Sequence, residues 1–297
     1  MNSKSCCTIQ SIRSATIQTS PTTISSGQIT PWGVSRVGGP FDGVGKKAWI
    51  IGTGIDLNNE DLNVDIANST SFVATESAQD VIGRGTYVAG ILAAKNNSID
   101  VVGVAAGATI VGVKVIASVD SASTSDILDG INYVTSKASS SDIINISWEI
   151  RDPNDNIHAI DDAITNSANS GLRYIIAAGD NGEPANRYTP SRVNNSNVWT
   201  VSAFKKGDTF AYLYDCLFGK SSNHGNPPID YSEPGDSIHP YTLVVDGDIA
   251  LDQLMVHTFA MMELHSLLHI WLAFYWPHQV ELVMVDMWLM MLTVIPI

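Results

Sequence analysis

Two groups of small residues follow predicted elements at places where a catalytic or binding site would form. The apolar, β-branched run 47–51 precedes Gly-Thr-Gly at 52–54, which predicts a buried strand ending in a tight turn. Residues 83–94 (GRGTYVAGILAA) have apolar side chains three and four apart, so they predict a closely packed helix. Side chains on such a turn could do acid–base or nucleophilic chemistry.

The glycines at 52–54 also fit the start of a dinucleotide-binding fingerprint, in which a pyrophosphate rests on a helix N-terminus. The third glycine of that fingerprint is missing, because Leu57 occupies its position. The acidic loop 58–61 would also repel phosphate. Nucleotide binding is therefore the weaker alternative, and we predict no cofactor.

The same two segments resemble the first two signatures of the subtilisin-like serine peptidases. In that family D-[ST]-G-[IV] carries the triad aspartate, and G-H-G-T-H-[VC]-A-G carries the triad histidine. Gly52 stands in the place of the aspartate and Arg84 in that of the histidine, while residues 53–56 and most of 85–90 match the family. The resemblance implies a peptidase scaffold that has lost two triad groups.

A further segment resembles the family strand along which a substrate's extended backbone pairs with the enzyme. The resemblance places substrate binding at Ser147, Trp148 and Glu149. Glu149 and Ile150 stand where the family has glycines. We therefore expect a charged and a β-branched side chain to obstruct this edge.

Residues 177–182 (AAGDNG) resemble the family's A-A-G-N, whose asparagine donates a hydrogen bond to the oxyanion of the tetrahedral intermediate. Asp180 takes the place of that asparagine. An ionised carboxylate has no proton to donate and would repel the developing negative charge. The resemblance therefore predicts an oxyanion site without its donor.

Strand and helix patterns alternate beyond the first turn. Strands are predicted at 47–51, 109–115, 143–147, 174–178 and 198–203, with helical stripes between them. One helix is expected to begin behind the cap candidates Thr124 and Ser125, and the next to stop at Gly171. The alternation predicts an α/β fold. With the resemblance, it predicts three subtilisin-like layers, a central, mostly parallel sheet with helices on both faces.

Composition limits the classes of protein and partner. A chain of 297 residues with 44% hydrophobic content can bury a full core, so one main domain is expected. A net charge of −14 argues against nucleic acid or an anionic membrane surface as partner. The cysteines Cys6, Cys7 and Cys216 have no metal-ligand spacing, so we predict neither a zinc site nor a disulfide framework.

We divide the chain into three parts. Residues 1–30 are rich in Ser and Thr and lack the apolar core of a signal peptide, so we interpret them as a disordered leader. The family is usually secreted, and the compartment of this chain stays unassigned. Residues 31–236 form an incomplete peptidase-like domain. Residues 237–297 contain neither Lys nor Arg and carry no family signature.

The apolar part 237–297 lacks Gly-Thr-Ser-x-Ala, so it supplies no nucleophile. Charged and histidine side chains interrupt it before twenty apolar residues accumulate, and we expect no membrane span. His265 and His269 are four residues apart near Glu263, but they lack the H-E-x-x-H order of a zinc site. We therefore predict no metal site there.

We predict that the same part of the chain is encoded by the family's DNA read in the wrong frame. Residues 262–272 (MELHSLLHIWL) can be encoded so that reading from the last base of the Met262 codon gives G-T-S-F-A-S-P-H-M-A-G. That is the family's nucleophile signature. We predict a change of frame soon after Gly235.

The resemblance implies a serine endopeptidase that acts on polypeptides, and the substitutions predict a member without activity. The runner-up is a non-catalytic protein that keeps a peptide-binding groove. An active peptidase with displaced residues would have to recruit His158 or His224, the histidines before residue 237.

Overall fold

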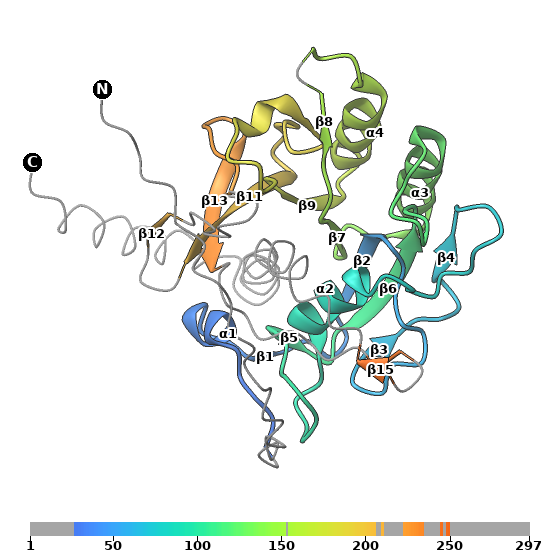
Figure 1. The fold of residues 1–297 in the computed structure, drawn as a ribbon, viewed down its shortest axis with the longest axis vertical. Helices are drawn as coiled ribbons and strands as arrows, with labels where there is room; N and C mark the ends of the chain where they lie inside the picture. Colours follow the sequence, from blue (N-terminus) through green and yellow to red (C-terminus); the bar gives the residue numbers. More distant parts are fainter. Residues whose placement is uncertain are drawn as a thin grey trace, which may run out of the picture.

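A mostly parallel sheet lies at the centre of the chain (Figure 1). The structure, a computed structural model, describes residues 27–152, 154–205, 209–210, 222–234, 244–245 and 248–249. The strand order is β12-β11-β9-β7-β2-β6-β3, with β13 also beside β11 and β4 also beside β6. These strands are β2 (Lys47–Gly52), β3 (Asn63–Val64), β4 (Thr70–Ser71), β6 (Thr109–Lys114), β7 (Ile143–Ile146), β9 (Arg173–Ala177), β11 (Val198–Lys205), β12 (Thr209–Phe210) and β13 (Ile229–Pro234). β12 pairs antiparallel with β11, and the other strand pairs described in this sheet are parallel.

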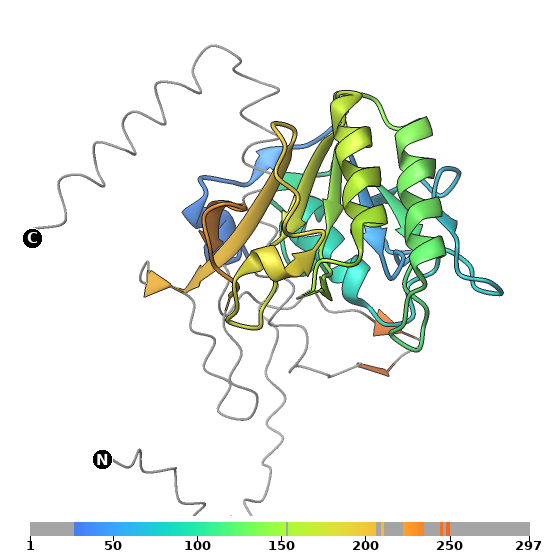
Figure 2. The same cartoon turned by 90° about the horizontal axis from the view of Figure 1, so that it is seen from above.

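Three helices cover the two faces of this sheet (Figure 2). α2 (Arg84–Ala93) packs on one face, and α3 (Thr124–Lys137) and α4 (His158–Asn169) lie side by side on the other. The shorter elements are α1 (Trp32–Arg36), η1 (Ala185–Arg187), β1 (Phe41–Asp42), β5 (Ala105–Ala106), β8 (Ile150–Arg151), β10 (Tyr188–Thr189), β14 (Val244–Val245) and β15 (Asp248–Ile249). The predicted three-layer α/β fold is confirmed.

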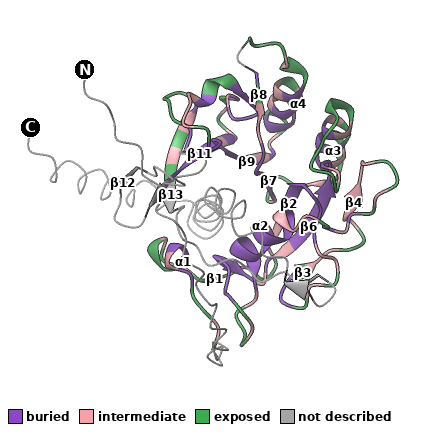
Figure 3. Cartoon of the chain, in the orientation of Figure 1, coloured by how far each residue is buried: buried purple, intermediate pink, exposed green. Residues whose placement is uncertain are grey.

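The sequence of the central strand β2 is mainly apolar because both faces of the strand are buried. Ala48 and Ile50 pack in the cluster that contains α2, whereas Trp49 and Ile51 pack in the cluster that contains α3 and α4. Figure 3 shows β2, β6 and α2 as mainly buried. A parallel strand with helices on both faces buries both sets of side chains, so its sequence does not alternate with polar residues.

The ends of the outer helices correct one prediction and confirm another. The cap of α3 is Ser123, whose Oγ accepts a hydrogen bond from the Asp126 amide at 3.1 Å, so the candidates Thr124 and Ser125 were wrong. A cap must come from the extended residue before the first turn, and Ser123 has φ −95° and ψ 147°. Gly171, with φ +100°, follows α4 as predicted.

Residues 53–62 form turns and a bridge rather than a helix. A dinucleotide fingerprint needs a helix directly after the glycine turn, because its N-terminus holds the pyrophosphate. The next helix of this region, α2, begins only at Arg84. This order of elements disfavours the nucleotide-binding alternative.

Within the described part of the chain, none of the helices has the length and apolarity that crossing a membrane would require.

A buried lysine connects β6 to the segment that leads into α2. The Lys114 side chain is 1% exposed, and its Nζ lies 2.8 Å from Glu76 Oε2 and donates to the Gln79 carbonyl at 3.0 Å. The hydrogen bond from Lys114, with bonds from Ser118, lowers the pKa of Glu76 to about 2. Ser118 lies in the loop after β6, and Glu76 lies in the loop that leads into α2. The Glu76 carboxylate therefore joins these two loops.

We expect Glu76→Gln to lower the melting temperature at pH 7. The pKa of Glu76 is lower in the folded state than its ordinary value of 4.5, so its contribution is present above pH 4.5 and is lost as the pH falls toward 2. The difference between variant and wild type should therefore shrink between pH 5 and pH 3. Circular dichroism melts at several pH values measure it. Glu60→Gln, an exposed control, should not alter the pH profile, and an identical effect of both substitutions would refute the assignment.

Candidate functional site

The turn after β2 and the start of α2 are joined by hydrogen bonds between side chain and backbone. Thr53 Oγ1 accepts from the Gly85 amide at 2.8 Å, and Thr86 Oγ1 accepts from the Asp56 amide at 2.8 Å. A Cβ on Gly85 would lie 2.1 Å from the Gly54 carbonyl oxygen, so only glycine permits this approach. The two predicted groups of small residues therefore form one rigid corner.

A buried carboxyl group, which the sequence did not reveal, caps the first turn of α2. Asp80 is 1% exposed and accepts hydrogen bonds from the Gly83 amide at 2.8 Å and from the Thr86 amide and hydroxyl, both at 2.9 Å. Burial raises the pKa of Asp80, and the bonds from Thr86 and Gly83 oppose that rise. The helix start is fixed independently of the residue at position 84.

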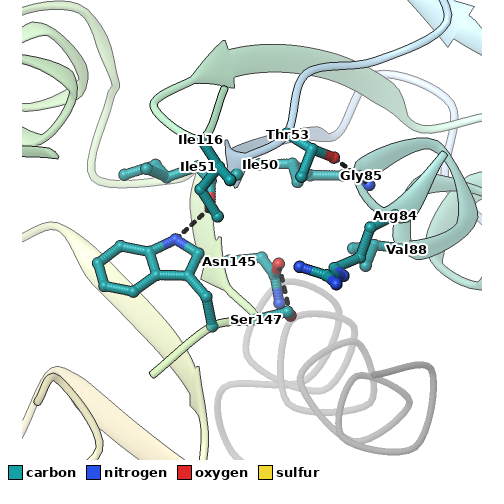
Figure 4. A pocket seen from close by; sticks show the side chains of 11 residues that line it. Ile50, Ile51, Thr53, Arg84, Gly85, Val88, Ile116, Asn145 and Ser147 are labelled. Carbon is teal, nitrogen blue, oxygen red and sulfur yellow. Dashed lines mark hydrogen bonds between the residues drawn. The ribbon is translucent and has the colours of Figure 1, made fainter. Parts of the chain in front are cut away.

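A small hollow lies beside this corner, between the end of β2, the end of β7 and the start of α2 (Figure 4). Its enclosed space is about 10 Å³, enough for about one water molecule, and the rest of it is open to solvent. The lining residues come from these elements and the segments after them: Ile50, Ile51, Gly52, Thr53, Arg84, Gly85, Val88, Ile116, Asn145, Ser147 and Trp148. The structure thus brings together four of the predicted site residues.

Gly52 and Arg84 differ in how they line the hollow. A Cβ added to Gly52 would meet no atom within 4 Å, so open space lies where a side chain would project. The Arg84 Nη1 donates to Asp120 Oδ1 at 2.9 Å, and its side chain is 16% exposed. A guanidinium stays protonated at any working pH, so it cannot serve as a general base.

Asn145 and Ser147 lie on the opposite wall, at the end of β7. Asn145 is 2% exposed, and its Oδ1 accepts from Ser147 Oγ at 3.0 Å. The neighbouring indole of Trp148 donates from Nε1 to the Ile51 carbonyl at 2.9 Å, which fixes the ring against β2. An amide oxygen is too weak a base to activate the Ser147 hydroxyl.

Glu149 and Asp180 do not line the hollow but lie at the neighbouring ends of β7 and β9. Glu149 Oε1 accepts from Asn181 Nδ2 at 3.1 Å, and Asp180 is 6% exposed. The buried Asn223 holds this turn, because its Nδ2 donates to the Ala178 carbonyl at 2.9 Å and its Oδ1 accepts from the Asn181 amide at 3.0 Å. The bond from Asn181 to Glu149 spans the two strand ends.

The histidines that a displaced triad would use do not line the hollow. His158 begins α4, where its side chain is 59% exposed and lies 3.9 Å from Asp155. His224 is exposed in the segment that bridges to Pro184. The alternative of an active peptidase with displaced residues gains no support from their positions. Glu263, His265 and His269 lie outside the described residues.

A cluster of oxygen atoms lies around the side chain of Gln28, at the far end of α2. Gln28 Nε2 lies 2.7 to 3.2 Å from four oxygens: the carbonyls of Lys95, Ile99 and Val101, and Asn97 Oδ1. Asn97 Nδ2 in turn donates to Asp61 Oδ1 at 2.6 Å. The –NH₂ group has two hydrogens, so it cannot satisfy four acceptors at once.

The donor set around Gln28 fits a hard divalent cation such as Ca²⁺. Carbonyl, amide and carboxylate oxygens are the ligands that Ca²⁺ prefers, and the Gln28 amide group occupies the centre of the cluster. No group of three His, Cys, Asp or Glu side chains that could hold a metal occurs among the described residues. Cysteine and histidine spacing in the sequence cannot indicate such a site, because main-chain carbonyl ligands do not depend on residue type.

We expect millimolar Ca²⁺ to raise the melting temperature of the chain, and EDTA to lower it. A ligand at a hundred times its Kd stabilises the folded state by about 2.7 kcal/mol, which corresponds to roughly 5 to 10 °C. Asp61→Asn, measured by calorimetry with and without Ca²⁺, should lose this response. Asp129→Asn, exposed on α3, is the control. An unchanged melting temperature in EDTA would exclude the cation.

The fold and the sequence resemble those of known proteins. The family model for the Subtilase family matches residues 43–265. The chain is 35% identical to Subtilisin Savinase of Lederbergia lenta over 176 residues (57% of this chain, 62% of the relative), and 35% identical to Subtilisin E of Bacillus subtilis (strain 168) over 170 residues (54% and 43%).

A solved structure, that of a cold adapted subtilisin-like serine proteinase, matches with a TM-score of 0.61 at 25% identity and covers 84% of this chain and 86% of that one. The chain spans less than two thirds of the length of Subtilisin Savinase and of Subtilisin E. The family match covers most of the sequence and includes the corner formed by β2 and α2. The chain therefore belongs to the subtilase family, the subtilisin-like serine peptidases.

Proposed function

We propose that this chain is a subtilase that does not hydrolyse peptide bonds. The observation that carries the proposal is the hollow beside β2, where Gly52 and Arg84 face the same space. The family's strand and helix signatures place its aspartate and histidine at these two positions. A glycine has no carboxylate to orient a base, and a guanidinium cannot accept the proton of a nucleophile.

The turn after β9 supports the same proposal. Asp180 replaces the asparagine that would stabilise the oxyanion, and Glu149 brings a second carboxylate to the neighbouring strand end. Two negative charges beside a developing oxyanion would raise the energy of the transition state. The substitutions thus affect the positions of the family's aspartate, of its histidine and of its oxyanion asparagine together.

The nucleophile is the third part of the proposal. The sequence contains no Gly-Thr-Ser-x-Ala, and permitted codons for residues 262–272 can encode that signature in an alternative frame. These residues, like most of 237–297, lie outside the described part of the chain. We propose that a change of frame has removed the serine from the protein.

A non-catalytic protein that binds polypeptides is the second candidate. The family acts on polypeptides, and Ser147, Trp148 and Glu149 lie at the strand end where its substrates would pair. In this chain the side chain of Glu149 is hydrogen bonded to Asn181 across the gap between the strand ends. A bound peptide would have to displace this contact, so we rank the binding function below the loss of function.

We expect no hydrolysis of peptide or ester substrates above background. For subtilisin, itself a member of this family, removing the triad serine or histidine is known to lower kcat by about 10⁶. The assay is a fluorogenic peptide library together with a fluorophosphonate probe. The triple variant Gly52→Asp, Arg84→His, Asp180→Asn should also stay inactive, because it restores no nucleophile. Probe labelling of a serine that disappears on denaturation would overturn the proposal.

The coding DNA tests the change of frame separately. We expect the codons of Leu264 and His265 to contain a serine triplet in the alternative frame, preceded by glycine and threonine triplets. Restoring that frame by one insertion or deletion after codon 235 should yield a chain with the family's nucleophile signature. Codons that give no serine there would show that residues 237–297 are an unrelated segment.

A further inference from the structure

We propose that Asn181 and Gly182, in the turn after β9, form a site of spontaneous deamidation, and that the reaction releases the contact between Asn181 and Glu149. They are the only Asn-Gly pair in the sequence. The reaction belongs to the chain itself, so it does not depend on whether the protein hydrolyses peptides. Three features of the turn support it: exposure to solvent, a following residue without a side chain, and a neighbouring carboxylate that the product would repel.

The reaction joins the side chain of Asn181 to the backbone of Gly182. After losing its proton to hydroxide, the Gly182 amide nitrogen attacks Asn181 Cγ, which stands next to it along the chain. The bond from Cγ to the side-chain nitrogen breaks, and this nitrogen takes a proton from water and leaves as ammonia. Water then opens the succinimide ring. Cleavage at Cγ gives aspartate, and cleavage at the backbone carbonyl gives isoaspartate, so the net change is water consumed and ammonia released.

The turn presents the reacting groups to solvent. Asn181 is exposed, so water reaches it and ammonia can leave. Gly182 has φ +66° and no Cβ, so no side chain shields its nitrogen. The amides on either side, of Asn181 and Glu183, both donate to Asn223 Oδ1 at 3.0 Å, whereas the Gly182 amide is not part of this pair of bonds. The buried Asn223 thus holds the chain on both sides of the nitrogen that has to react.

Deamidation reverses the interaction between the two strand ends. Asn181 Nδ2 donates to Glu149 Oε1 at 3.1 Å, and this bond joins the turn after β9 to the end of β7. A carboxylate at position 181 has no proton to donate, so the attraction becomes repulsion between like charges. Asp180 is the adjacent residue and brings a further carboxylate. The contact with Glu149 is therefore lost in the product.

The nearby arginines do not neutralise the new charge, because both are paired with Glu183. Arg151 Nη2 lies 3.2 Å from Glu183 Oε1, and Arg187 Nη1 lies 3.8 Å from Glu183 Oε2. The hydrogen bond from Arg151 lowers the pKa of Glu183, so this carboxylate is ionised at neutral pH. Deamidation therefore adds a negative charge to a turn whose cations already have a partner.

The chemical test follows the full-length chain during incubation at mildly alkaline pH. Mass spectrometry of the tryptic fragment 174–187 and labelling by an isoaspartyl methyltransferase measure the two products at position 181. We expect them to form at least about tenfold faster than at Asn166, which is also exposed but lies in α4, where the helix must open locally before the ring can close. Asn181→Gln should abolish the labelling of this fragment.

The unfolded chain shows whether the fold permits the reaction. A folded chain that stays unmodified at position 181, under conditions in which the urea-unfolded chain is modified there, would overturn the proposal, because the fold would then protect the turn. Equal rates at Asn181 and Asn166 in the folded chain would overturn it as well.

Thermal melting tests the consequence for Glu149. Asn181→Asp reproduces one product in a uniform sample, and its melting temperature should be lower by roughly 2 to 4 °C than that of Asn166→Asp, which adds the same charge on an exposed helix position. Glu149→Gln should remove most of this difference, because the like charge is then absent. The two substitutions should thus be non-additive in a double-mutant cycle. Additive effects would show that the reaction does not act through Glu149 and would contradict that part of the proposal.

Discussion

The close approach of α2 to the turn after β2 is the constraint on which the site depends. Gly85 lies directly over the Gly54 carbonyl, and the hydrogen bond from the Gly85 amide to Thr53 Oγ1 holds the two elements together. Asp80 completes the corner from the buried side by capping the first turn of α2. Any side chain on Gly85 would separate the helix from the sheet, so the corner tolerates little change.

This constraint explains how the chain can keep family signatures around substituted catalytic positions. Residues 53, 54, 85 and 86 form the contacts between the elements, whereas the side-chain position of Gly52 meets open space and Arg84 lies at the rim. A change at position 52 or 84 therefore alters chemistry without breaking packing. A change at a flanking position would break packing without any direct effect on chemistry.

The far end of α2 is held by a different kind of interaction. The oxygen cluster around Gln28 joins residues 95–101, which follow the helix, to Asp61, which lies in the loop after β2. The two ends of α2 are thus fixed relative to β2 by direct hydrogen bonds at one end and by a candidate cation site at the other. Both leave the hollow open between β2 and β7.

The sequence by itself determined the layers and the corner. The apolar run of β2, bounded by glycines, predicted a strand covered on both faces, and Gly54 and Gly85 are the glycines at which the backbones approach closely. The tertiary structure alone decided that Asn145 and Arg84 face one hollow, that Asn223 holds the turn of Asp180, and that Gln28 meets residues 95–101. The physical reason is that propensity and periodicity describe neighbours along the chain. Pockets and oxygen clusters arise where distant segments meet, and no local pattern encodes which polar atoms will share that space.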